Sequence, residues 1–174
     1  MPRHTSLDPA RGVLIVEWPL FGELSRGLAL KVSRAYHPDV VVGVATAGVV
    51  PGAVVAAMLG CDFHSILVSR KYHAETVRDT PAIFGEAPPQ VLNRRVLIVD
   101  ETCDGGDTLR LAISSLQHAG AIEVRTAVCF RTGTYEPDYH ALATESAVVL
   151  PWDREIIVND ALVPNPAYRE LLGA

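Results

Sequence analysis

Residues 96–113 read VLIVDETCDGGDTLRLAI and contain the end of one structural element and the start of the next. The apolar run 96–99 is typical of a strand buried on both faces of a sheet. The glycine pair 105–106 allows a tight turn, and Asp107 suits the cap of a helix that we expect over 108–118. The stretch therefore predicts a strand–turn–helix unit with acidic residues gathered where the strand ends.

The same alternation of apolar runs and helical periodicity extends along most of the chain. Repeated strand–helix units predict a mostly parallel sheet with helices on both faces. We therefore expect one α/β domain over residues 1–174, with about five parallel strands, flanking helices and a small hood built from the chain ends. The expected strands are 13–18, 40–44, 63–68, 96–99, 124–130 and 147–150, and the expected helices are 20–35, 53–59 and 108–118, with 45–52 as a loop.

The composition is that of an ordinary soluble globular protein, with 49% hydrophobic and 20% charged residues. The net charge of −5 and the absence of a polybasic block argue against a nucleic-acid-binding surface. No apolar run approaches the roughly 18–20 residues of a membrane span, and residues 1–12 lack the apolar core of a signal peptide. Three cysteines without a close pair are typical of a reducing compartment, so we expect a cytoplasmic protein.

The end of the strand at 96–99 is where a ligand is expected, because ligands of parallel sheets bind beyond the carboxyl ends of the strands. Asp100 and Glu101 lie there, and the turn and helix that follow supply backbone N–H groups and the positive end of a dipole. Together these predict an anion site sized for a phosphate monoester, beside carboxylates suited to sugar hydroxyls and a divalent metal. The alternative is structural, since acidic residues are common helix caps and a Gly-Gly pair can be only a turn.

The stretch VLIVDETCDGGDTL resembles the phosphoribosyl pyrophosphate (PRPP) signature of the type I phosphoribosyltransferases, and most closely that of the purine branch, the xanthine, guanine and hypoxanthine enzymes. The similarity covers most of residues 13–155. The resemblance implies that Asp100 and Glu101 hold the ribose hydroxyls, with Mg²⁺ nearby through PRPP and water, and that Asp104 exchanges a proton with the base. The residues implied to wrap the 5-phosphate are Asp104, Gly105, Gly106, Asp107 and Thr108. Gly105 replaces the family's usual Thr, which removes a hydroxyl donor worth about 1.5–3 kcal/mol.

Residues 42–60, VGVATAGVVPGAVVAAMLG, resemble the family's pyrophosphate loop, which uses backbone amides, often around a cis peptide. Thr46, Ala47 and Gly48 take the place usually held by Arg-Gly-Gly, so a basic side chain is missing. Without the resemblance, these residues are equally consistent with an ordinary βα loop.

Residues 69–95 show no clean periodicity and correspond in position to the family's flexible loop, which closes over the active site. Arg70 and Lys71 are implied to contact pyrophosphate, and the alternative for each is a solvated basic turn. Such a lid would exclude water that could hydrolyse the activated ribose.

Two later segments resemble those that bind the base. Arg131, in the segment 129–141, takes the place of a base-recognising Lys and would donate to the exocyclic oxygen of a 6-oxopurine. Trp152, in the segment 148–156, would lie against the purine face, with Asp153 at the base edge. The alternatives are a surface Arg after a strand and a core or dimer-interface Trp.

The resemblance implies a purine phosphoribosyltransferase that transfers 5-phosphoribosyl from PRPP to hypoxanthine, guanine or xanthine with Mg²⁺, giving a nucleoside monophosphate and pyrophosphate. It also implies a homodimer or homotetramer, with no nucleic-acid or membrane partner. Two alternatives stay open. One is a regulator on the same fold that senses PRPP or a nucleotide without turnover, and the other is a transferase for another base, such as a pyrimidine.

Overall fold

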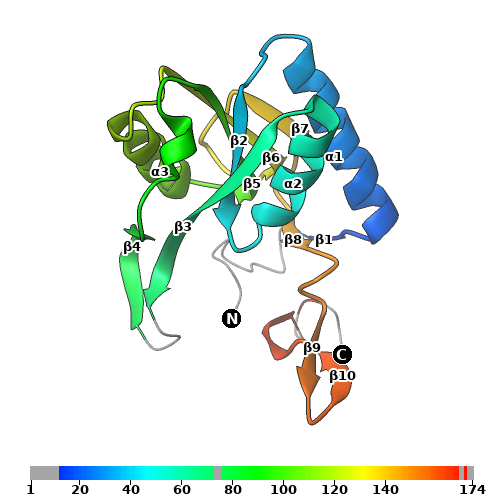
Figure 1. Ribbon diagram of the computed structural model, residues 1–174. Helices are drawn as coiled ribbons and strands as arrows, with labels where there is room; N and C mark the ends of the chain where they lie inside the picture. The colour runs from blue at the N-terminus through cyan, green and yellow to red at the C-terminus, as the bar shows by residue number, and fades with distance from the viewer. Residues whose placement is uncertain (1–11, 73–75, 169–170, 172–174) are drawn as a thin grey trace.

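The computed structural model describes residues 12–72, 76–168 and 171, and gives only the backbone at 70–72 and 76–79. Its centre is a six-stranded sheet in the order β4-β3-β2-β5-β6-β7 (Figure 1). The strands are β2 (Val40–Ala45), β3 (Asp62–Tyr72), β4 (Thr76–Phe84), β5 (Arg95–Cys103), β6 (Glu123–Arg131) and β7 (Tyr139–Ala143). All neighbours pair in parallel except β3 and β4, which are antiparallel. The predicted α/β fold with a mostly parallel sheet is confirmed.

Helices cover both faces of this sheet, as predicted. Helices α1 (Trp18–Ser33) and α2 (Val49–Leu59) lie on one face, and α3 (Asp107–His118) lies on the other (Figure 1). Residues of β5 alternate between the two cores: Leu97 packs under α1 and α2, and Ile98 packs toward α3. Both side chains are fully buried, which explains why the apolar run 96–99 shows no polar alternation.

The chain ends form smaller elements beside the sheet. Strand β1 (Val13–Ile15) pairs in parallel with β8 (Ala147–Val149). Strands β9 (Glu155–Val158) and β10 (Ala161–Pro164) form an antiparallel hairpin that projects from the body of the domain (Figure 1). Short 3-10 turns lie at Pro89–Val91 and Pro166–Tyr168. A small hood was expected to be built from these two ends of the chain.

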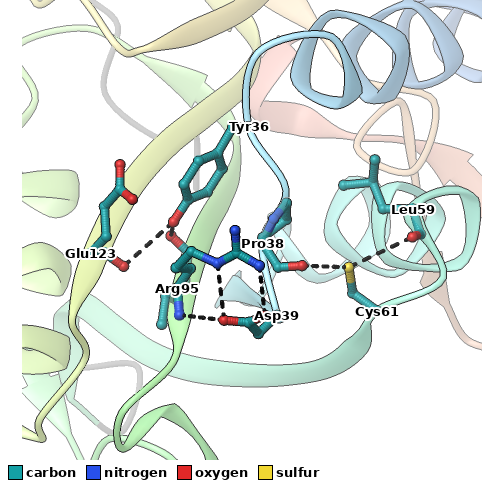
Figure 2. Close-up of polar contacts among 8 residues, drawn as sticks. Tyr36, Pro38, Asp39, Leu59, Cys61, Arg95 and Glu123 are labelled. Atoms are coloured by element: carbon teal, nitrogen blue, oxygen red, sulfur yellow. Dashed lines mark hydrogen bonds and ion pairs between the residues drawn. The ribbon is translucent and has the colours of Figure 1, made fainter.

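A polar cluster ties the amino ends of β2 and β5 together (Figure 2). Asp100 and Glu101 lie toward the other end of β5. Arg95 Nη2 lies 2.9 Å from Asp39 Oδ1, and the backbone N–H of Arg95 donates to Asp39 Oδ2 at 2.9 Å. The Tyr36 hydroxyl donates to the carbonyl of Val96 at 3.2 Å, and burial raises the pKa of that hydroxyl above its usual range. These contacts hold β2 and β5 together at their amino ends. The loops that follow the two strands lie at their carboxyl ends.

Several predicted boundaries were wrong. Residues 45–52 were expected as a loop, yet α2 begins at Val49 and contains Pro51, because proline is tolerated in the first turn of a helix. The segment 69–95, for which no regular structure was expected, contains the end of β3 and all of β4. In the described ranges, no helix has the length and apolar character needed to cross a membrane.

Candidate active site

The acidic pair lies near the carboxyl end of β5, in the middle of the sheet. Asp100 is 7% exposed and Glu101 is 4% exposed. The Asp100 Oδ1 atom accepts the backbone N–H of Glu101 at 2.9 Å. Removing carboxylates from water costs several kcal/mol each unless charges or hydrogen bonds compensate. These two carboxylates lie at the carboxyl end of β5, which is where the ligands of parallel sheets bind.

The loop after β2 packs directly against this pair. A Cβ atom built on Gly48 would lie 2.7 Å from Asp100 Oδ1, 2.7 Å from the Val44 carbonyl and 2.8 Å from the Val99 carbonyl, so only glycine fits there. Thr46 is exposed, Ala47 is buried, and the Ala45–Thr46 peptide bond is cis. Gly48 of the predicted pyrophosphate loop is thus in contact with Asp100 of the predicted ribose-binding pair.

The turn between β5 and α3 contains the glycine pair 105–106, at the position where an anion site was predicted. Gly106 is the N-cap of α3 and adopts a φ of +81°, a conformation that favours glycine. Asp104, Gly105 and Asp107 are exposed. The positive end of the α3 dipole lies at this turn, and the N-terminus of a helix favours a bound anion. We call residues 104–108, which include Thr108 in the first turn of α3, the phosphate loop.

The segment that follows β6 lies against the phosphate loop. A Cβ atom on Gly133 would lie 1.9 Å from Asp104 Oδ1 and 2.8 Å from the Asp104 Cα atom. The backbone N–H of Thr132 donates to the Cys103 carbonyl at 2.8 Å. This close approach places Asp104, the predicted proton acceptor, beside the segment that was predicted to recognise the base. Sequence analysis did not identify Gly133, because the contact depends on how the ends of β5 and β6 meet.

Arg131 is the last residue of β6 and pairs in register with Cys103 at the end of β5. Its Nη1 atom lies 3.2 Å from Glu136 Oε2 and donates to the Gly133 carbonyl at 3.4 Å. Its Nε atom is buried and has no hydrogen-bond partner among the described residues. Arg131 therefore lies at the same edge as the acidic pair, and its role toward a base stays a prediction.

Trp152 and Asp153 follow β8. The Trp152 ring packs edge-on against Phe21, with 4.9 Å between ring centroids, and lies 5.7 Å from the Trp18 ring on α1. This aromatic cluster gives Trp152 a packing role, and its predicted place against a purine stays a prediction. The backbone N–H of Asp153 donates to the Leu150 carbonyl at 3.0 Å, which caps the turn after β8.

Arg70 and Lys71 were predicted to contact pyrophosphate. Their backbone belongs to β3, and their side chains fall outside the described part of the chain. Their role therefore stays a prediction.

The donor set fits a magnesium ion held mainly by its substrate. Mg²⁺ prefers oxygen ligands and commonly takes one or two carboxylates together with water and phosphate oxygens. Asp100 and Glu101 supply such carboxylates. Within the described ranges, no group of three or more His, Cys, Asp or Glu side chains could hold a metal by itself. Cys103 is no candidate ligand, because burial raises its thiol pKa to about 12 and the side chain packs in the core under α3.

The fold is an α/β domain in which acidic residues and glycine turns gather at the carboxyl ends of the parallel strands. The chain matches the family described as "Phosphoribosyl transferase domain" over residues 14–159, and therefore belongs to it. Two curated relatives are the adenine phosphoribosyltransferase of Acidiphilium cryptum (30% identical, 57% of this chain, 62% of the relative) and the xanthine-guanine phosphoribosyltransferase of Vibrio parahaemolyticus (28% identical, 82% and 90%). The first match spans less than two thirds of that relative's length. The crystal structure of the purine phosphoribosyltransferase of Pyrococcus horikoshii superposes with a TM-score of 0.70 at 29% identity, covering 84% of this chain and 98% of that one.

Proposed function

We propose that this chain is a purine phosphoribosyltransferase that transfers 5-phosphoribosyl from PRPP to a 6-oxopurine. The observation that carries the proposal is the contact between the Gly48 loop and Asp100, with the phosphate loop beginning four residues after Asp100, directly beyond the end of β5. PRPP carries a pyrophosphate on one side of its ribose and a phosphate on the other. Two anion-binding loops on either side of a carboxylate pair match that arrangement of groups.

The reaction forms a bond between a ring nitrogen of the purine and the anomeric carbon of the ribose. The bond from that carbon to pyrophosphate breaks, and its electron pair leaves with pyrophosphate. Positive charge builds on the ribose ring as this bond breaks, and the fixed carboxylates of Asp100 and Glu101 stabilise that charge while orienting the hydroxyls. Asp104 accepts the proton that the purine nitrogen loses.

Two further parts of the site support the transfer. When bound, Mg²⁺ would neutralise charge on the pyrophosphate leaving group, with Asp100 and Glu101 as its protein neighbours. The N-terminal turn of α3 would hold the 5-phosphate through its backbone N–H groups and the positive end of the helix dipole. Both interactions fix the ribose so that its anomeric carbon is presented to the base.

The choice of a 6-oxopurine rests on Arg131. A guanidinium can donate to an exocyclic oxygen, whereas adenine presents an amino donor at that position. The Arg131–Glu136 ion pair keeps the guanidinium near the Gly133 carbonyl at the end of β6. The relatives include enzymes named for adenine and for xanthine and guanine, so this preference is the finer part of the proposal.

A binding experiment tests the carboxylate pair. We would measure PRPP binding by calorimetry with Mg²⁺ present, in the wild-type chain and in an Asp100→Asn, Glu101→Gln double variant. We expect the double variant to bind at least tenfold more weakly, because hydrogen bonds to charged acceptors are worth about 1.5–3 kcal/mol each. The matched control is Asp62→Asn, which removes an exposed carboxylate from the start of β3 at the opposite edge. Equal PRPP affinity in all three proteins would contradict the proposal.

A further inference from the structure

The phosphate loop is intrinsically flexible at its centre. It contains two successive glycines, and glycine has more conformational freedom to lose than any other residue. A Cβ atom on Gly105 would meet nothing within 4 Å, so no neighbour confines that residue by packing. Cys103 and Leu109, on either side of the loop, are both buried in the core under α3. A fixed anion site therefore needs contacts that hold the residues between these two anchors.

Hydrogen bonds from the segment 132–135 to the backbone at the start of the loop supply part of that support. The N–H and the hydroxyl of Thr132 donate to the Cys103 carbonyl at 2.8 and 3.2 Å. The N–H of Tyr135 donates to the Asp104 carbonyl at 3.1 Å. The chain at residues 103–104, where the phosphate loop begins, is thus hydrogen-bonded to the segment that follows β6.

The ring of Tyr135 covers the second glycine. A Cβ atom on Gly106 would lie 2.3 Å from both the Cγ and the Cδ2 atoms of Tyr135, so the ring rests directly on the backbone at this point. The ring also packs against the buried core under α3. Gly106 is therefore held between its own helix and an aromatic side chain from a distant part of the sequence.

Arg110 closes the arrangement from the other side. Its Nη1 atom donates to the Gly105 carbonyl at 2.7 Å and to Asp107 Oδ1 at 3.2 Å. Its guanidinium carbon lies 4.8 Å from the centre of the Tyr135 ring, within the range of a cation–π interaction. One guanidinium thus connects the loop backbone, the first turn of α3 and the aromatic ring.

We propose that Tyr135 and Arg110 are positioning residues that clamp the phosphate loop in the shape that receives the 5-phosphate. The proposal rests on the proposed function in one respect, the identity of the anion as a sugar 5-phosphate. Neither side chain is required to touch the ligand. Their effect is to lower the ordering cost that the two glycines would otherwise add to phosphate binding.

Ribose 5-phosphate is a suitable probe, because it tests the phosphate loop without any chemical step. Calorimetry would compare wild type with Tyr135→Ala, Tyr135→Phe, Arg110→Met and Arg110→Lys. We expect Tyr135→Ala to raise the Kd about tenfold, and Tyr135→Phe to match wild type because the ring makes the contact with Gly106. Arg110→Met should raise the Kd several-fold. Arg110→Lys should not restore affinity, because a lysine keeps the charge but loses the planar fork and the stacking on Tyr135.

Hydrogen exchange separates a clamp from a general loss of stability. The amides at 110, 132 and 135 donate to the carbonyls of Gly106, Cys103 and Asp104, so their exchange reports on the order of the loop. In Tyr135→Ala and Arg110→Met, this loop exchange should be at least tenfold faster, while the amides of 96–99 exchange as in wild type. Arg26→Met is the matched control, since Arg26 pairs with Glu23 on the exposed surface of α1. It should change neither measurement.

The clamp is overturned if loop exchange and Kd stay within twofold of wild type in Tyr135→Ala, or if Arg110→Lys binds as tightly as wild type. Failure of wild type to bind ribose 5-phosphate also overturns it. If wild type binds ribose 5-phosphate and the variants behave as expected, but no pyrophosphate is released from PRPP with any base, the clamp stands and the proposed transfer reaction fails.

Discussion

Replacement of Gly48 by Ala tests the contact on which the site depends. The added methyl group would lie 2.7 Å from the Asp100 carboxylate and within 2.8 Å of two backbone carbonyls. These atoms belong to β2 and β5, so the strands or the loop must shift to admit it. Overpacking of this kind costs about 1–3 kcal/mol of unfolding free energy. Because Asp100 would be displaced, we also expect PRPP affinity to fall about tenfold or more.

Urea unfolding and calorimetric PRPP titration would measure the two effects of Gly48→Ala. Gly27→Ala is the matched control, because Gly27 is exposed in α1 and its Cβ would meet nothing within 4 Å. The free energy of unfolding of Gly27→Ala should rise by about 0.5–1 kcal/mol, because alanine has a higher helix propensity than glycine. The two variants are thus expected to shift stability in opposite directions. A Gly48→Ala protein as stable as wild type, with unchanged PRPP affinity, would refute the reasoning.

Three further predictions concern separate parts of the molecule. Gly105→Thr should lower the KM for PRPP about tenfold in a pyrophosphate-release assay, because the side chain enters open space and restores a hydroxyl donor to the phosphate; an unchanged KM would contradict this. Gly133→Ala should lower kcat by about 10²-fold with little change in PRPP affinity, because its methyl group displaces Asp104, and equal kcat values would count against that role. The guanidinium of Arg95 lowers the pKa of Asp39 from 3.8 to about 2, so this carboxylate should contribute about 1 kcal/mol of stability above pH 4 that is lost as the pH falls toward 2. The stability difference between wild type and Asp39→Asn, measured by urea unfolding from pH 2 to 7, should therefore vanish at the acid end, and a constant difference would contradict the assignment.

The central strand–turn–helix unit could be predicted because its signals are local. Val96 to Val99 are apolar without interruption, as a strand buried on both faces requires. The glycine pair marked the turn, and α3 begins at Asp107, one residue before its predicted start. The predicted start of α2 was four residues too late, and Pro51 is accommodated because a proline in the first turn of a helix loses no hydrogen bond.

The edge strands could not be predicted from local sequence. Strand β4 contains Pro81 and lies at the edge of the sheet, where a missing N–H is tolerated. Strand β7 is only half-buried and lacks a strong apolar run. Such strands are defined by the neighbour with which they pair, and pairing between distant segments leaves little periodicity in the sequence.

Only the part of the site that lies on one continuous segment could be predicted from the sequence. Asp100, Glu101 and the phosphate loop lie on one continuous segment, and their arrangement follows from the strand–turn–helix pattern. The contacts of Gly133 with Asp104 and of Tyr135 with Gly106 join segments almost thirty residues apart. A glycine three residues beyond the expected end of a strand was a weak signal for such a close approach.

The most direct test of the central claim is pyrophosphate release from PRPP and Mg²⁺ with hypoxanthine, guanine, xanthine, adenine, uracil and orotate, each measured with wild type and with Asp104→Asn. We predict release with at least one 6-oxopurine in wild type, and loss of turnover in a folded Asp104→Asn protein. Release with adenine alone would overturn the base assignment to Arg131. No release with any base, together with clear PRPP binding, would contradict the transfer reaction and identify the chain as a PRPP-binding regulator.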